Sequence, residues 1–230
     1  MIISLLFIFI LSIFVTYYFS KYFNLYDYPN SRKQHSLPTI FSGGVSLCLC
    51  YSSLIYFLEF NEIINDILIF SFVIMLLGLI DDIKNLDVYI RLFLQSVIIY
   101  TLIQKYNLNI DNIGEYNFGS INLGSFSDLF TVCCVLTIIN AKNYFDGIHG
   151  LCSSLFILCI FNLYLMIFIF NDVSELNILI LVSPVLIFLL FNIRAFKLPR
   201  IFLGDNGSNM LGFIFAFVSL YLVKLDNNNI

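Results

Sequence analysis

Long apolar runs alternate with short polar segments along the whole chain. A helix that crosses a bilayer needs about 20 mostly apolar residues, within a range of about 17–25. The pattern predicts about eight such helices, and we expect the short third and fifth to continue into the adjoining polar segments. The fold class we predict is all-α, a polytopic transmembrane helical bundle with residues 1–230 as one domain. The predicted helices cover 1–19, 43–60, 66–80, 89–104, 126–140, 151–170, 177–193 and 209–225.

The composition agrees with a chain that lies in lipid. Hydrophobic residues make up 60% of the sequence and charged residues 11%, and the mean hydropathy is +0.94. A soluble domain is about half apolar and about a quarter charged. The net charge of −4 argues against nucleic-acid binding, which needs a basic surface. The six cysteines lie in apolar runs without a zinc-binding spacing, so we interpret them as small apolar residues.

The distribution of basic residues predicts an orientation. The first apolar run, Met1–Phe19, has no basic segment before it and no small-residue cleavage site, so we interpret it as a retained helix with its N-terminus outside. The polar segments 20–42, 81–91, 140–150 and 194–208 then face the cytoplasm. They hold nine of the 11 basic residues, all but Lys105 and Lys224, as the positive-inside rule requires.

The first two of these segments also carry candidate chemistry. In the first, Arg32, Lys33 and His35 either set the topology or bind anionic phosphates. In the second, the adjacent carboxylates of Asp81 and Asp82 repel each other unless a cation is near, which suits a divalent metal or a metal–diphosphate complex. A helix cap explains one aspartate but not two. Two basic residues, Lys84 and Arg91, follow the pair.

The other two segments offer polar groups at helix ends. Asn140, Asn143 and Asp146 recur every three residues and predict a polar stripe on one side of a helix, which either serves the site or packs against another helix. The turn Gly204–Ser208 places one carboxylate, Asp205, just ahead of a helix. A helix N-terminus attracts phosphate, and a carboxylate there can hold Mg²⁺. An ordinary turn with a helix cap is the alternative.

Together and in this order, the four segments resemble the polyprenyl-phosphate N-acetylhexosamine-1-phosphate transferase family. That family carries D-x-P-x-x-R-K-x-H-x-x-P followed by Gly-Gly, then an Asp-Asp pair, then N-x-x-N-x-x-D-G, then G-D-x-G-S. The matching positions here are Asp27, Pro29, Arg32, Lys33, His35, Pro38, Gly43, Gly44, Asp81, Asp82, Asn140, Asn143, Asp146, Gly147, Gly204, Asp205, Gly207 and Ser208.

The resemblance implies Mg²⁺-dependent (or Mn²⁺-dependent) transfer of a sugar 1-phosphate from a UDP-sugar, expected to be a UDP-N-acetylhexosamine, to polyprenyl phosphate. UMP is released, and a cell-surface glycan is initiated at the cytoplasmic face of a bacterial inner membrane. A homodimer is one alternative for the oligomeric state. The resemblance implies Asp205 as the metal ligand and Asp81, Asp82 and Asp146 as catalytic residues. It implies substrate binding by Arg32, Lys33, His35, Lys84, Arg91, Asn140, Asn143, His149, Gly204 and Gly207.

Two departures from the family pattern leave a second hypothesis open. The family has a second aspartate in D-G-x-D-G-L, and His149 stands at that position here, which would alter nucleotide or sugar contacts. The family also continues to a last cytoplasmic loop with a His-rich motif, for which nothing up to Ile230 is a counterpart. The alternative is therefore a truncated, non-catalytic membrane protein or a subunit of the same family. A transporter fits less well, since the polar residues gather at one face and no repeat is visible.

Overall fold

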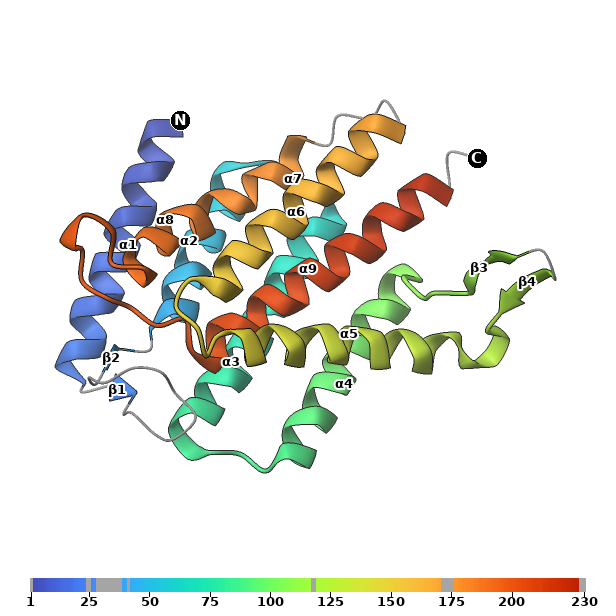
Figure 1. The fold of residues 1–230 in the computed structure, drawn as a ribbon, viewed down its shortest axis with the longest axis horizontal. Coiled ribbons are helices and arrows are strands. Elements are labelled where there is room, and N and C mark those ends of the chain that lie inside the picture. The colour runs from blue at the N-terminus through green and yellow to red at the C-terminus, as the bar shows by residue number, and fades with distance from the viewer. Residues whose placement is uncertain are drawn as a thin grey trace.

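A computed structural model describes residues 2–23, 26–27, 39–40, 42–116, 119–170 and 176–227, and it is a helical bundle (Figure 1). Leu181 separates α7 from α8, and these two together fill the predicted seventh helix, so the eight predicted helices are confirmed. The helices are α1 (Ile2–Tyr22), α2 (Gly43–Phe57), α3 (Glu62–Lys84), α4 (Val88–Tyr106), α5 (Ser127–Phe145), α6 (Leu151–Phe170), α7 (Leu176–Ile180), α8 (Val182–Asn192) and α9 (Gly204–Asn227).

Short elements join the helices. The strands β1 (Tyr26–Asp27) and β2 (Thr39–Ile40) pair antiparallel, as do β3 (Asn112–Tyr116) and β4 (Gly119–Asn122) in the connection from α4 to α5. Single 3-10 turns cover Gly124–Phe126 and Ala195–Lys197. The apolar pattern did not predict the two strand pairs, because they lie in polar connections that bury little apolar surface.

The chain is a membrane protein. Within the described residues, four helices are long and apolar enough to cross a bilayer: Ile3–Tyr22, Glu62–Lys84, Gly124–Phe145 and Gly204–Leu225. Shorter apolar helices cover Gly43–Phe57, Leu151–Met166 and Ile178–Asn192. Large apolar side chains are exposed along the outer helices, among them Phe7, Phe93 and Leu129, as a lipid-facing surface requires.

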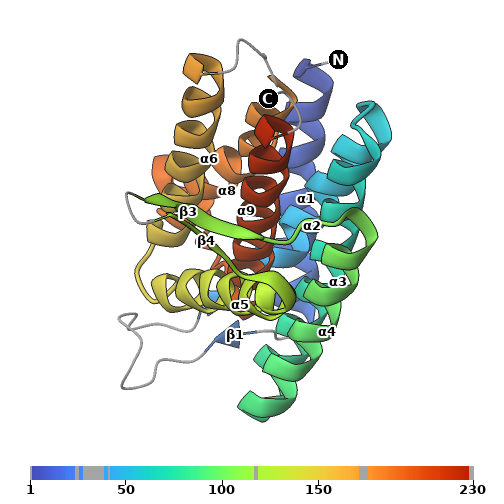
Figure 2. The same cartoon turned by 90° about the vertical axis from the view of Figure 1, so that its right-hand side faces the viewer.

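Helix α9 forms the centre of the bundle. It packs against α2, α3, α5 and α6, and Figure 2 shows it between α6 and α3 while α5 crosses it near one end. Glycine permits the close approach to α5, because a Cβ on Gly212 would stand 2.8 Å from the Cα of Ile139. Small residues at helix contacts let backbones approach in this way inside membranes.

Three helices reach into the polar segments, as expected for the third and fifth of the predicted helices. Helix α3 runs to Lys84 rather than residue 80, α5 runs to Phe145 rather than 140, and α9 begins at Gly204 rather than 209. The continuation of α3 and α5 was expected, whereas the predicted start of the last helix was wrong, because hydropathy stops at the first charge and a helix continues while its polar side chains find partners. The candidate residues of the last three segments therefore lie mostly on helix ends rather than in loops.

Backbone contacts hold these helix ends together. The N–H of Gly43 donates to the carbonyl of Phe202 at 2.9 Å, and the N–H of Gly44 donates to that of Leu203 at 3.2 Å. Buried Asn192 joins the starts of α6 and α9, since it accepts from the N–H of Gly150 at 2.6 Å and donates to the carbonyl of Ile201 at 2.8 Å. The start of α1 and the end of α9 lie at the other end of the bundle (Figures 1 and 2).

Candidate active site

The two adjacent aspartates of α3 have different partners. Asp82 caps the N-terminus of α9: it accepts from the backbone N–H groups of Asp205 and Asn206, each at 3.2 Å, and from the side chain of Asn206 at 2.5 Å. Four N–H groups at a helix N-terminus lack helical partners, and an anion there is stabilised by the helix dipole. The cap that the sequence offered as an alternative is thus present, but it serves a different helix.

Asp81 instead forms an ion pair with Arg91 of α4. The guanidinium donates to one carboxylate oxygen of Asp81 at 2.5 Å, and the other oxygen accepts from the N–H of Leu86 at 2.8 Å. Asp81 is buried, with 6% of its surface exposed. A buried charge needs a paired partner, which Arg91 supplies. The same guanidinium nitrogen lies 3.8 Å from a carboxylate oxygen of Asp205.

Helix α5 brings the third segment to the same place. The side chain of Asn143 donates to Asp205 at 2.8 Å and to the hydroxyl of Ser208 at 3.1 Å. Asp146 accepts from the N–H of Gly204 at 3.0 Å. The predicted polar stripe therefore faces α9, except that Asn140 donates to the carbonyl of Leu136 on its own helix.

The carboxylate of Asp205 is partly open to solvent. Its side chain is 39% exposed, whereas that of Asp81 is 7% exposed. The N–H groups of Gly204, Asp205 and Asn206 donate to the carboxylates of Asp146 and Asp82. These N–H groups at the start of α9 are therefore already bound by protein carboxylates. The group of this turn that is available to a ligand is the side chain of Asp205.

Three residues that sequence reasoning did not assign to the site build its frame. Asn206 is fully buried against α2 and α3. A Cβ on Gly44 would stand 2.0 Å from the Asn206 side-chain oxygen, and one on Gly78 would stand 2.6 Å from the Asn206 Cα. Only glycine leaves this space. Gly78 and the pair Gly43–Gly44 beside the charged segments were the available signal, but nothing in the sequence shows what they approach.

The remaining candidates lie at the edge of the cluster or outside the described residues. His149 stacks on Phe202, with ring centroids 4.8 Å apart and planes at 23°. Lys84 is exposed in the last turn of α3, and Gly207 lies in the first turn of α9. Arg32, Lys33 and His35 fall outside the described residues, so their roles stay predictions.

The described residues fit a divalent metal held in part by substrate. Mg²⁺ is commonly bound by one or two carboxylates together with phosphates and water. Among the described residues no group of three His, Cys, Asp or Glu side chains could hold a metal by itself. Asp205 does offer one exposed carboxylate, which Asn143 orients.

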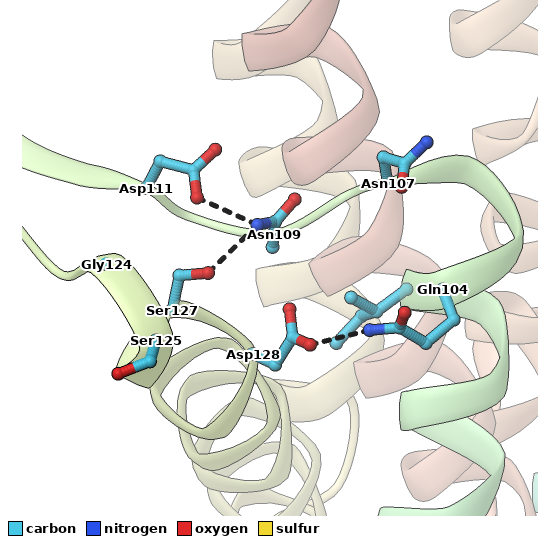
Figure 3. A pocket seen from close by; sticks show the side chains of 9 residues that line it. Gln104, Asn107, Asn109, Asp111, Gly124, Ser125, Ser127 and Asp128 are labelled. Carbon is cyan, nitrogen blue, oxygen red and sulfur yellow. Dashed lines mark hydrogen bonds between the residues drawn. The ribbon is translucent and has the colours of Figure 1, made fainter.

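A separate polar cavity of about 350 Å³ lies at the other end of α4, between that helix and the start of α5. Gln104 donates to Asp128 at 2.6 Å, and Asn109 donates to Asp111 at 2.8 Å and to Ser127 at 2.9 Å (Figure 3). The cavity contains no residue of the four segments. We therefore assign the candidate active site to the cluster around Asp205.

Fold and site together define a polytopic helical membrane protein with an arginine and several carboxylates gathered at one end. A sequence profile of glycosyl transferase family 4 matches residues 64–223, and the chain belongs to this family. It is 29% identical over 211 residues to the undecaprenyl-phosphate alpha-N-acetylglucosaminyl 1-phosphate transferase of Escherichia coli O157:H7, covering 87% of this chain and 56% of that protein. The chain thus spans about half the length of the first curated relatives it matches.

A second kind of relative also matches. The chain is 27% identical over 233 residues to the phospho-N-acetylmuramoyl-pentapeptide-transferase of Petrotoga mobilis, covering 93% of this chain and 71% of that protein. The relative in Yersinia pestis, again an undecaprenyl-phosphate alpha-N-acetylglucosaminyl 1-phosphate transferase, is 26% identical over 205 residues, or 85% of this chain and 55% of that protein. The resemblance drawn from the four segments is confirmed, and the relatives are phospho-sugar transferases.

Proposed function

We propose that this chain transfers an N-acetylhexosamine 1-phosphate from a UDP-sugar to polyprenyl (undecaprenyl) phosphate, releases UMP and so initiates a cell-surface glycan. The observation that carries the proposal is the convergence of α3, α4, α5 and α9 on Asp205 through Asp82, Arg91 and Asn143. The names of the relatives support the reaction class.

The reaction needs little help from a general base. The second pKa of a phosphate monoester is near 6, so the lipid phosphate is largely dianionic at neutral pH. One of its oxygens attacks the sugar-bearing phosphorus, a new P–O bond forms, and the bond to the UMP oxygen breaks. Asp81 and Asp82 are engaged with Arg91 and with α9, so we assign them positioning roles rather than proton abstraction.

The harder task is to bring two anionic phosphates together. Mg²⁺, or Mn²⁺, on Asp205 would neutralise the diphosphate and stabilise the leaving UMP. Asn143 fixes one oxygen of Asp205, and Arg91 adds positive charge close to the other. Asp146 fixes the start of α9 by accepting from Gly204, and it thereby sets the position of Asp205.

We propose further substrate contacts for the other candidate residues of the four segments. Arg32, Lys33, His35 and Lys84 are the basic side chains that we assign to the phosphates. We assign the His149–Phe202 stack, with Asn140 and Gly207, to the nucleotide and sugar.

The proposed setting is the cytoplasmic face of a bacterial inner membrane. Nine of the 11 basic residues lie in the polar segments of this end, which the positive-inside rule places in the cytoplasm. A water-soluble UDP-sugar and a membrane-bound lipid phosphate can meet at such a boundary. We propose residues 1–230 as one transferase domain that works as a monomer or a homodimer.

The test is transfer of labelled sugar phosphate from UDP-N-acetylglucosamine to undecaprenyl phosphate in membranes that contain the chain. We expect Mg²⁺-dependent product and a loss of about 100-fold or more in Asp205→Asn, the size expected when one group that stabilises transition-state charge is removed. Asp128→Asn, in the separate cavity of Figure 3, is the matched control and should keep its activity. Full Mg²⁺-dependent activity in Asp205→Asn would refute the metal role.

The same assay addresses the non-catalytic alternative, which the coverage of 56% of the Escherichia coli O157:H7 relative motivates. That relative, expressed in parallel, serves as the positive control. Product from the relative and none from folded, membrane-inserted chain would favour a non-catalytic protein or a subunit.

A further inference from the structure

Gln95 of α4 is buried without a polar partner. None of its surface is exposed, and within the described residues neither its side-chain nitrogen nor its oxygen makes a hydrogen bond. Almost all buried polar groups in folded proteins are hydrogen-bonded, and leaving both atoms of a carboxamide unpaired is unfavourable. The unpaired carboxamide of Gln95 therefore needs a physical explanation.

The residue one turn before Gln95 on the same face of α4 is Arg91. Residues four apart on a helix are neighbours, about 6 Å apart along the axis. The Nε of Arg91 is also buried and has no partner among the described residues, while another nitrogen of its guanidinium binds Asp81. Arg91 thus has a buried donor without a partner in the described chain, and Gln95 follows it by one turn on the same helix face.

Helix α9 also has a buried amide side chain one turn after a charged residue of the cluster. Asn209 follows Asp205 by one turn, is 2% exposed, and has a side-chain nitrogen without a partner in the described part of the chain. Among Arg91, Gln95 and Asn209, the unpaired buried atoms are three donors and one acceptor, the Gln95 oxygen. The side-chain oxygen of Asn206 is a second buried acceptor without a partner among the described residues, but it lies at the start of α9 against Gly44, whereas the Gln95 oxygen lies on the same helix face as Arg91.

We infer that Gln95 is a positioning residue for Arg91: its carboxamide oxygen accepts from the Arg91 Nε through one bridging water and holds the guanidinium on Asp81 and back from Asp205. The inference rests on the proposed function, because it takes Asp205 to be the metal ligand. The Arg91 guanidinium lies 3.8 Å from the Asp205 carboxylate and so leaves that carboxylate available to a metal. A guanidinium that moved onto Asp205 would compete with a divalent cation for the same carboxylate.

The experiment measures Mn²⁺ binding to the purified chain in the presence of UDP-N-acetylglucosamine by the loss of the free-ion EPR signal relative to a protein-free blank, together with the melting temperature. Gln95→Met keeps the length of the side chain and removes the acceptor. We expect it to weaken Mn²⁺ binding by about fivefold or more, the lower end of usual coupling between sites. Gln104→Met is the matched control on the same helix, because Gln104 donates to Asp128 away from the cluster, and it should leave Mn²⁺ binding unchanged.

A double variant tests whether Gln95 acts through Arg91. Arg91→Lys keeps the positive charge and removes the Nε–H, so Gln95→Met should have little further effect in that background. If Gln95→Met weakens Mn²⁺ binding equally in both backgrounds, the inference is overturned. It is also overturned if Gln95→Met raises the melting temperature and leaves Mn²⁺ binding unchanged, because Gln95 is then only an unpaired buried amide.

A measurement on the unaltered side chain covers the case in which Gln95→Met does not fold. In protein with ¹⁵N-labelled arginine, the Arg91 Nε–H signal is assigned by its loss in Arg91→Lys and should exchange slowly with solvent. Rapid exchange would contradict the inference. The proposed function has a separate test. It is refuted if the unaltered chain binds Mn²⁺ but transfers no sugar phosphate.

Discussion

Asp82 accepts a backbone hydrogen bond from Asp205 at 3.2 Å, although the two residues are 123 positions apart in the sequence. Through it, the C-terminal turn of α3 supplies the cap that the first turn of α9 lacks. The carboxylate of Asp205 is thereby fixed at the end of the bundle, within reach of Arg91 and Asn143.

Removal of the Asp82 cap should reduce both stability and activity. Loss of a helix cap costs about 0.5–2 kcal/mol, and each kcal/mol lowers the melting temperature of a chain of this size by about 2–4 °C. We expect Asp82→Ala to melt several degrees lower and to lose transfer activity. Asp87→Ala removes the exposed cap of α4, and it should lower the melting temperature without the loss of activity. Equal activity in the two variants would contradict the role given to Asp82.

Gly78 should tolerate no side chain. The added Cβ of Gly78→Ala would overlap the backbone of Asn206, so α9 must move away from α3. Overpacking of this kind costs about 1–3 kcal/mol, which thermal unfolding in detergent would detect. Gly147→Ala is the matched control, because its Cβ would meet only a carbonyl oxygen 3.7 Å away. A melting temperature of Gly78→Ala at or above that of Gly147→Ala would show that the contact is not tight.

The two ion pairs of α4 should differ in their contribution to stability. Arg91→Met leaves the buried Asp81 charge unpaired, which typically costs about 3–5 kcal/mol. Lys105→Met breaks a pair with Asp66 in which the lysine is exposed, and solvent screening makes the loss from such a pair much smaller. Urea unfolding of both variants gives the comparison. Similar losses in the two would argue that Asp81 does not depend on Arg91.

His149 should affect substrate affinity more than turnover. Its ring stacks on Phe202, two residues before Gly204, and an aromatic pair contributes about 0.5–1.5 kcal/mol. We expect His149→Ala to raise the KM for the UDP-sugar several-fold with little change in kcat. His149→Asp restores the family pattern, and a comparison of UDP-sugars with this variant reports on selectivity. A change confined to kcat would place His149 in the chemical step instead.

Much of the fold followed from the sequence because each long apolar run must find lipid or protein. The eight helices were predicted in order, and the four polar segments were predicted to share one face. The continuation of the third and fifth helices to Asp81 and Asn143 was expected, but the start of the last helix was placed too late, because hydropathy excludes Asp205 although it finds a partner on α5.

The sequence by itself determined which residues are candidates for the site, since the spacing of Asp81–Asp82, Asn143 and Asp205 is a local property of the chain. Tertiary structure alone decided their roles. It placed Asp81 on Arg91 and Asp82 on α9, although the two are neighbours with the same side chain. The physical reason is that helix packing sets contacts between distant residues, and here Gly44 and Gly78 determine how closely α9 can approach.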